Sequence, residues 1–391
     1  MTHTETMTSL NRRVRWLAPL TAAVLLGAGG SAVGVISAAA RSGLPHRSAA
    51  ELLVDVQKAR LDGLSGTIVQ NADLGLPSLP GVGGSGSSNM TSLISGSHTL
   101  RLWYSGPDHV RLALLGTLGE SDLVRNGNDL WTWSSSDRSA THRTLPPGGG
   151  HEPRGLASGS AMTPQRAADA ALHAITPSTK VATDGTAVVA GRSAYELLLT
   201  PRDTGSLVGS VRIAVDAKTH VPTRVRVFAK NATKPALEVG FTSFDPTAPA
   251  ASAFRFNPPP GTKVTQAGGH RHPMVGAHKS PLTRGHAAHR LARNDKGHAL
   301  LGAKAVQAPR VVGTGWTSVV VTSLPRGALA GSGSTAKPML SMLRMLPKVS
   351  GTWGSGHLVH GSLFSALLTD DGRVAVGAVS PDALYAALAR R

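Results

Sequence analysis

Apolar and polar residues alternate in many short segments between residues 64 and 241, and this pattern constrains the fold more than any other feature of the chain. Successive side chains of a β-strand point to opposite faces, so a period of two is what a half-buried antiparallel strand requires. The sequence therefore predicts a mainly β protein with helices (α+β). The clearest alternating segments are His98–Tyr104, Val110–Leu114, Asn128–Ser134, Tyr195–Leu199, Val211–Val215 and Leu237–Phe241.

Two helices are predicted among these strands. Ser48 and Glu51 have the spacing of a capping box, in which both side chains accept hydrogen bonds from free backbone N–H groups at the start of a helix. Apolar residues then recur at helical spacing as far as Ala59. A second helix is expected from Thr163, a suitable N-cap, because Pro164 after it is well accommodated at the first helical position.

The alternation stops near Gly261, and a different composition follows. Residues 262–310 are rich in Gly, His, Lys and Arg, with Asp295 as their only acidic residue, which predicts a basic, disordered linker. Strand-like segments then return, with a hairpin across Asp370-Asp371-Gly372 and a last helix that begins at Ser380-Pro381. We therefore expect a β domain at residues 45–261 and a small α+β domain at residues 311–391.

Residues 1–44 form a predicted export or anchor segment. Arg12, Arg13 and Arg15 precede an uncharged run from Trp16 to Ala40, which exceeds the ~20 residues that span a bilayer. The small residues at the end of this run would suit a signal peptidase, so a cleaved signal peptide and a retained transmembrane anchor both fit. Under either alternative the rest of the chain is exported and works at the extracytoplasmic face of the membrane.

The composition indicates an anionic partner. The chain carries a formal net charge of +18 and has a pI near 11.2, so its surface favours nucleic acid, anionic lipids or anionic cell-wall polymers. Export makes nucleic acid an improbable partner. We therefore expect an anionic membrane or cell-wall surface and no nucleic acid.

Several chemistries find no support in the sequence. The chain has no cysteine, which excludes disulfides, thiolate metal sites and cysteine catalysis. The linker histidines lack a regular spacing, and the Gly81–Gly86 match to G-x-G-x-x-G follows Pro80 instead of a strand. No metalloprotease, hydrolase or phosphate-binding motif is present. We expect no metal site, no cofactor and no enzymatic activity.

Five segments of the chain resemble a known family, the LolA/RseB-like proteins, and most of all the actinobacterial LolA-like exported proteins. The resemblance covers about residues 45–265. A looser likeness at Val374–Pro381 is to the closing strand and helix of the second domain of RseB. The five segments are Leu64–Gln70, Leu102–Pro107, Gly127–Trp133, Val189–Leu197 and Val215–Pro222.

The resemblance implies an open, curved antiparallel sheet, an incomplete barrel, that holds a hydrophobic cavity covered by helices. LolA carries acylated lipoproteins. RseB adds a small second domain and binds a membrane anti-sigma factor. The implied function is a non-catalytic extracytoplasmic protein that binds a lipid or an acylated protein, and the alternative is an envelope-stress regulator that binds an anti-sigma factor.

The candidate binding residues are apolar residues on the predicted strands. A dry groove of such side chains can hold an acyl chain, which gains about 0.8 kcal/mol per buried CH₂. The same residues also suit an ordinary packed core, and the sequence leaves both alternatives open. The candidates are Ile68, Leu102, Leu112, Leu114, Trp131, Leu197, Leu199, Val211 and Ile213.

Overall fold

A computed structural model gives the structure of the chain. It describes residues 43–76, 87–88, 92–93, 95–146, 163–173, 177–267, 309–324 and 345–390. The chain divides into two units, residues 1–46 and residues 47–391, and every helix and strand described below belongs to the second unit.

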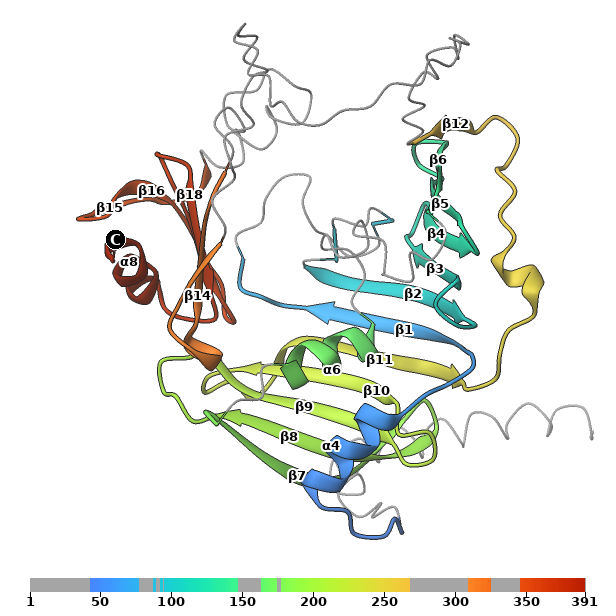
Figure 1. Ribbon diagram of the computed structural model, residues 1–391, viewed down its shortest axis with the longest axis horizontal. Coiled ribbons are helices and arrows are strands. Elements are labelled where there is room, and N and C mark those ends of the chain that lie inside the picture. The colour runs from blue at the N-terminus through green and yellow to red at the C-terminus, as the bar shows by residue number, and fades with distance from the viewer. Residues whose placement is uncertain are drawn as a thin grey trace, which may run out of the picture. The chain divides into compact units, whose positions relative to one another are not determined.

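The larger sheet has twelve strands and is open and curved (Figure 1). Its strand order is β12-β6-β5-β4-β3-β2-β1-β11-β10-β9-β8-β7, so β12 and β7 are its edges. All neighbouring pairs are antiparallel except β12 and β6, which are parallel. The strands are β1 (Leu64–Ala72), β2 (Gly96–Tyr104), β3 (His109–Leu115), β4 (Glu120–Asn126), β5 (Asp129–Ser134), β6 (Ser139–Thr144), β7 (Thr179–Val189), β8 (Arg192–Pro201), β9 (Val208–Asp216), β10 (Pro222–Ala229), β11 (Pro235–Asp245) and β12 (Lys263–Gln266).

Two helices lie on one face of this sheet (Figure 1). Helix α4 (Ala49–Lys58) contacts β7 and β8, and helix α6 (Pro164–His173) contacts β10 and β11. The predicted capping box is confirmed, because the Ser48 hydroxyl accepts from the Glu51 N–H and the Glu51 carboxylate accepts from the Ser48 N–H. Thr163 caps α6 by accepting from the backbone N–H of Arg166.

The opposite face of strands β8–β10 is polar. Glu196 is buried there, and its carboxylate lies 2.5 Å from Arg226 and 3.7 Å from both Arg212 and Arg224. Burial lowers the pKa of Arg224, the neighbouring Arg226 lowers it further, and Glu196 acts in the opposite sense. A buried carboxylate is tolerated here because several guanidinium groups compensate its charge.

The smaller sheet has six strands in the order β13-β14-β18-β17-β16-β15, and all its pairs are antiparallel. Helix α8 (Pro381–Ala389) packs on it, and Leu367 and Leu384, both 0% exposed, lie in the shared core. The predicted hairpin is confirmed, with Gly372 at φ 88° between β17 and β18. The strands are β13 (Arg310–Val312), β14 (Val319–Ser323), β15 (Lys348–Gly351), β16 (Gly354–His360), β17 (Ser365–Thr369) and β18 (Arg373–Gly377).

Hydrogen bonds join the two sheets at three places. The indole N–H of Trp316 donates to the Thr179 hydroxyl at 2.7 Å. The other two are backbone hydrogen bonds. The N–H of Leu207 donates to the Ala378 carbonyl at 2.8 Å, and the N–H of Ser362 donates to the Leu74 carbonyl at 2.7 Å. The two sheets therefore share a polar, directional contact.

Parts of the predicted organisation lie outside the described residues. They include the export or anchor segment as far as residue 42, the glycine-rich loop at residues 81–86 and residues 268–308 of the predicted linker. The sheet itself continues past Gly261, because β12 pairs with β6. Within the described ranges, no helix has the length and apolar character that a membrane crossing requires.

The β9–β10 turn depends on one buried carboxylate. Asp216 receives two hydrogen bonds from the Arg192 guanidinium, at 2.7 and 2.9 Å, and others from the backbone N–H groups of Lys218 and Thr219. Burial raises the pKa of Asp216, but the bonds from Arg192 and Thr219 outweigh it, so the pKa lies below its usual value.

Replacing this carboxylate should destabilise the fold. We expect Asp216→Asn to lower the free energy of unfolding by about 3 kcal/mol at pH 7, because the Arg192 charge loses its buried partner. A carboxyl with a lowered pKa stabilises the folded state above its unfolded pKa, so the difference should shrink as the pH falls below about 4. Urea unfolding measures it, with the exposed Asp203→Asn as control. If the difference in free energy of unfolding between wild type and Asp216→Asn does not depend on pH, the ion pair with Arg192 is not its cause.

Candidate functional site

Eight of the nine candidate binding residues share one face of the twelve-stranded sheet. The strand register shows this directly, because Ile68 pairs with Leu100, Leu100 with Leu114, Leu197 with Ile213 and Leu199 with Val211. Phe241, Val239 and Val225 continue the same face across β11 and β10. We call this the apolar face. Its candidate residues are Ile68, Leu102, Leu112, Leu114, Leu197, Leu199, Val211 and Ile213.

The apolar face is almost completely removed from solvent. Seven of these eight side chains are buried, and Leu102 is half-buried. Helix α4 contributes Leu52 and Val56 to this cover, whereas α6 buries Pro164, Ala167 and Ala168 and leaves Leu172 half-buried. A buried alanine contributes much less apolar area than a leucine.

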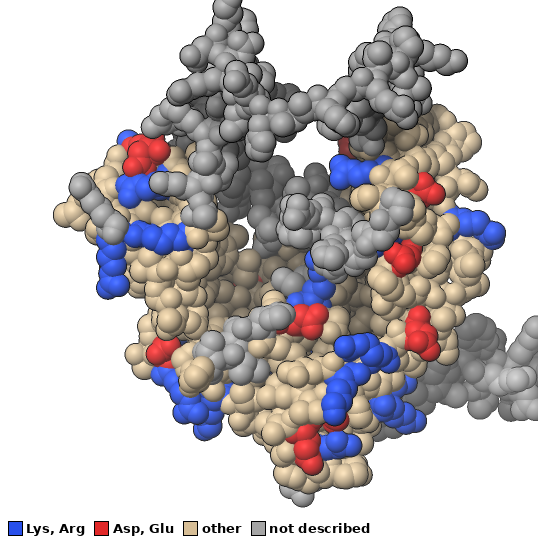
Figure 2. Space-filling view, viewed as in Figure 1, with Lys and Arg blue, Asp and Glu red and all other residues tan. Residues whose placement is uncertain are grey.

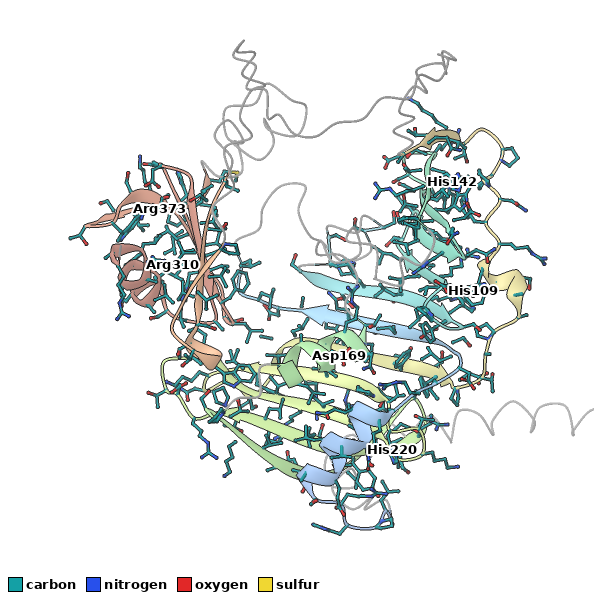
Figure 3. All side chains as sticks on the ribbon, in the orientation of Figure 1. His109, His142, Asp169, His220, Arg310 and Arg373 are labelled. Carbon is teal, nitrogen blue, oxygen red and sulfur yellow. The ribbon has the colours of Figure 1, made fainter. Side chains whose placement is uncertain are left out.

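The ninth candidate, Trp131, lies on the opposite face. Its ring stacks on His142 with centroids 4.2 Å apart, and Phe256 packs against it at 5.3 Å. The 3-10 helix η2 (Ala251–Phe254) precedes Phe256 and covers this part of the sheet, where the rings of Phe254 and His109 are in edge contact. Figure 3 shows His109 and His142 at this end of the sheet. The structure therefore separates Trp131 from the other eight candidates.

A buried carboxyl lies on the same opposite face. Asp122 is the cross-strand partner of Trp133, its side chain is 1% exposed, and Arg111 donates to it at 2.5 Å. Burial, together with the neighbouring carboxyl of Glu120, raises the pKa of Asp122 to about 7. The attraction of Arg111 lowers the pKa but does not cancel these two effects. Near neutral pH this carboxyl therefore exists in both protonation states.

Gln70 and His98 are polar residues of the apolar face on β1 and β2, and the nine candidates did not include them. Gln70 and His98 are each 2% exposed, and they pair across β1 and β2. The Gln70 amide donates to the Leu93 carbonyl at 2.5 Å, and His98 Nε2 lies 2.8 Å from the Ser95 carbonyl. A polar residue at an inward position of an alternating strand is the sequence signal that could have identified them.

Charged side chains on the view in Figure 2 form small groups, with much of the described surface between them made of other residues. Several arginines of the large sheet have acidic partners, among them Arg125 with Asp108 at 2.6 Å and Arg47 with Asp55 at 2.7 Å. Such local pairing lowers the field of the sheet surface. The predicted anionic membrane or cell-wall partner therefore stays an expectation from the net charge.

The architecture agrees with the one that the sequence resemblance implied. An open, curved antiparallel sheet carries helices on its apolar face, and a second, small α+β unit follows it in the chain. The fold class that the resemblance implied, an open and curved antiparallel sheet with few helices, is confirmed.

No family model matches the chain, and no curated protein matches it. The solved complex of MucA and MucB from Pseudomonas aeruginosa matches with 16% identity and a TM-score of 0.40, over 87% of this chain and 96% of that chain. A crystal structure of MucB matches with 15% identity and a TM-score of 0.39, over 87% and 96%. A LolA superfamily protein from Nitrosomonas europaea matches with 10% identity and a TM-score of 0.20, over 54% and 99%.

The buried Asp122 should make stability depend on pH. A carboxyl whose pKa is raised on folding makes the folded protein less stable as the pH rises. The loss occurs between the pKa of the unfolded state, near 4, and the pKa of the folded state, near 7. An Asn at this position cannot ionise. We therefore expect the stability of wild type relative to Asp122→Asn to fall by about 2–4 kcal/mol between pH 4.5 and 7.5 and to level off above that.

Unfolding by urea across this pH range measures the difference, and Asp203→Asn, an exposed change, should give a flat profile. The opposite trend, in which wild type gains stability over Asp122→Asn as the pH rises, would show that the Arg111 ion pair dominates.

Proposed function

We propose that this protein is a non-catalytic extracytoplasmic binding protein that holds a lipid or an acylated protein on the apolar face of its large sheet. The observation that supports the proposal is the continuity of that face. Inward residues of β1–β3 and β8–β11 form one apolar surface across seven neighbouring strands. An acyl chain needs such a surface, because it gains about 0.8 kcal/mol for each CH₂ removed from water.

The way the helices cover this face also supports binding. Helix α6 contacts β10 and β11, and its buried residues are Pro164 and the small Ala167 and Ala168. An acyl chain that takes the place of these side chains can bury more apolar area than they do. The energetic cost of moving α6 is therefore small compared with the gain from a bound chain of ten or more CH₂ groups.

Export and the basic charge fit the same function. A chain that is held near the membrane by an N-terminal segment, or attracted to it by a net charge of +18, works where acylated ligands occur. We propose the extracytoplasmic side of the cell membrane as the place of action, with anionic lipid or wall polymer as the surface it contacts.

A charged residue on the apolar face should abolish binding. We expect the full chain, purified from a membrane-containing host, to show a discrete added mass in native mass spectrometry that extracts as lipid. Leu102→Asp should lose this mass, because its carboxylate would lie against the acyl chain. Leu118→Asp is the matched control, since Leu118 is 97% exposed. A folded wild-type protein without bound lipid would contradict the proposal, and circular dichroism establishes that both variants fold.

A regulatory function is the competing proposal, and the second sheet favours it. RseB-like proteins add such a unit and bind a membrane anti-sigma factor, and the Pseudomonas match is a complex of MucB with MucA. Here the six-stranded sheet is joined to the first by the Trp316–Thr179 hydrogen bond and two backbone bonds. Because these hydrogen bonds hold the two sheets together, one protein partner could contact both sheets.

The regulatory proposal predicts a binary complex. The full chain should bind the extracytoplasmic segment of a single-pass membrane anti-sigma factor from the same cell, with an affinity that lipid changes by tenfold or more. Surface plasmon resonance measures this with and without lipid. If the protein binds lipid stoichiometrically but binds no such segment, the regulatory proposal is contradicted and only the lipid-binding proposal remains.

A further inference from the structure

Gln70 and His98 place two hydrogen-bonding side chains side by side within the apolar face. They are cross-strand partners on β1 and β2, and each is 2% exposed. The neighbouring residues of the same face, Ile68, Leu100 and Val239, are all 0% exposed. Each polar side chain has one partner, a backbone carbonyl of the segment before β2, and one atom that has no partner among the described residues.

The two carbonyl partners fix the chemistry of the remaining atoms. A carbonyl oxygen only accepts, so the Gln70 atom 2.5 Å from the Leu93 oxygen is the amide nitrogen, and Oε1 is the atom left over. The same reasoning puts the proton of a neutral His98 on Nε2, which lies 2.8 Å from the Ser95 oxygen. His98 Nδ1 then carries a lone pair. Both remaining atoms, Gln70 Oε1 and His98 Nδ1, are therefore acceptors.

Two buried acceptors of this kind require a donor. Neither Gln70 Oε1 nor His98 Nδ1 meets a donor from the described part of the chain, and they cannot bond to each other because both accept. A buried polar group without its hydrogen bond is strongly disfavoured, so such groups normally pair with protein, water or ligand. A bound molecule that carries an N–H or O–H would satisfy this pair.

We propose that Gln70 and His98 form a donor-selective subsite in the apolar face, which binds a neutral hydroxyl or amide N–H next to the acyl chain of a ligand. This proposal rests on the proposed lipid-binding function and specifies the chemistry of the ligand. An anionic carboxylate or phosphate does not fit, because two acceptor lone pairs would face its negative charge in a buried environment. A plain hydrocarbon does not fit either, because it leaves both acceptors without partners.

Matched amphiphiles test the subsite on the full chain. Dodecan-1-ol has an O–H donor, and dodecyl methyl ether has a similar chain without one. Dodecanamide and N,N-dimethyldodecanamide form the corresponding pair for an N–H donor. Displacement of a neutral fluorescent fatty-alcohol probe gives the Kd of each. We expect the wild-type chain to bind at least one donor compound about tenfold more tightly than its partner, and the pair that shows the preference identifies the donor group.

Variants assign this preference to the two side chains. Gln70→Met and His98→Phe keep the side-chain volume but remove the acceptors, so the ratio of the two Kd values should fall to about 1. The ratio is informative because a variant with a looser fold would bind both compounds more weakly, which leaves the ratio of their Kd values unchanged. Thr223→Val is the control, since the buried Thr223 hydroxyl already donates to the Ala214 carbonyl, and it should keep the wild-type ratio.

The possible failures are distinguishable. Equal Kd values within both pairs for the wild-type chain would overturn the subsite and leave lipid binding intact, as would a preference that persists in both variants. Binding of none of the four compounds would overturn the subsite and the proposed function together.

Discussion

Backbone pairing in the twelve-stranded sheet is the constraint on which the rest of the structure depends. A shift of one residue between two strands would turn every side chain of one of them to the other face. The apolar face is continuous from β8 to β3 only because each pair keeps the phase of its neighbours, as the chain of partners Leu197, Ile213, Val225 and Val239 shows. Irregularities do occur, at Thr67/Ile68 between β1 and β11 and near Pro222 between β9 and β10.

Local features of this fold could be predicted from the sequence, because they depend on residues close together in the chain. The capping box at Ser48, the cap at Thr163 and the turn at Gly372 each involve residues within four positions of one another. The strand pairings are different. Strand β1 pairs with β11, about 175 residues later in the chain, and β12 forms a parallel pair with β6. No local pattern specifies such partners, and they follow from which apolar faces must be buried together.

The candidate site shows the same division. Alternation placed eight residues on one face, because the period of two is a property of each strand alone. Trp131 obeys the same alternation but faces the other side, where His142 and the segment around Phe256 cover it. Which side of a strand meets helices and which meets an extended segment depends on the long connection after β11. The sequence places the end of the β domain at the end of this connection, near Gly261, but no local pattern predicts that it packs over β3–β5.

Both faces of the large sheet bury polar side chains, and on both faces some of their atoms have no partner within the described part of the chain. On the face that carries Glu196 and Asp122, buried carboxyls lie beside arginines of neighbouring strands, so each charge has a counter-charge within the protein. The apolar face contains no such pair at β1 and β2, where Gln70 and His98 each keep one acceptor without a donor from the described chain. Leucine at both positions would remove the two unpaired acceptors, but it would also take the hydrogen-bond donors from the Leu93 and Ser95 carbonyls. Retaining two acceptors in an apolar surface makes sense when that surface must distinguish one amphiphile from another, since hydrocarbon contacts alone discriminate weakly between chains of equal length.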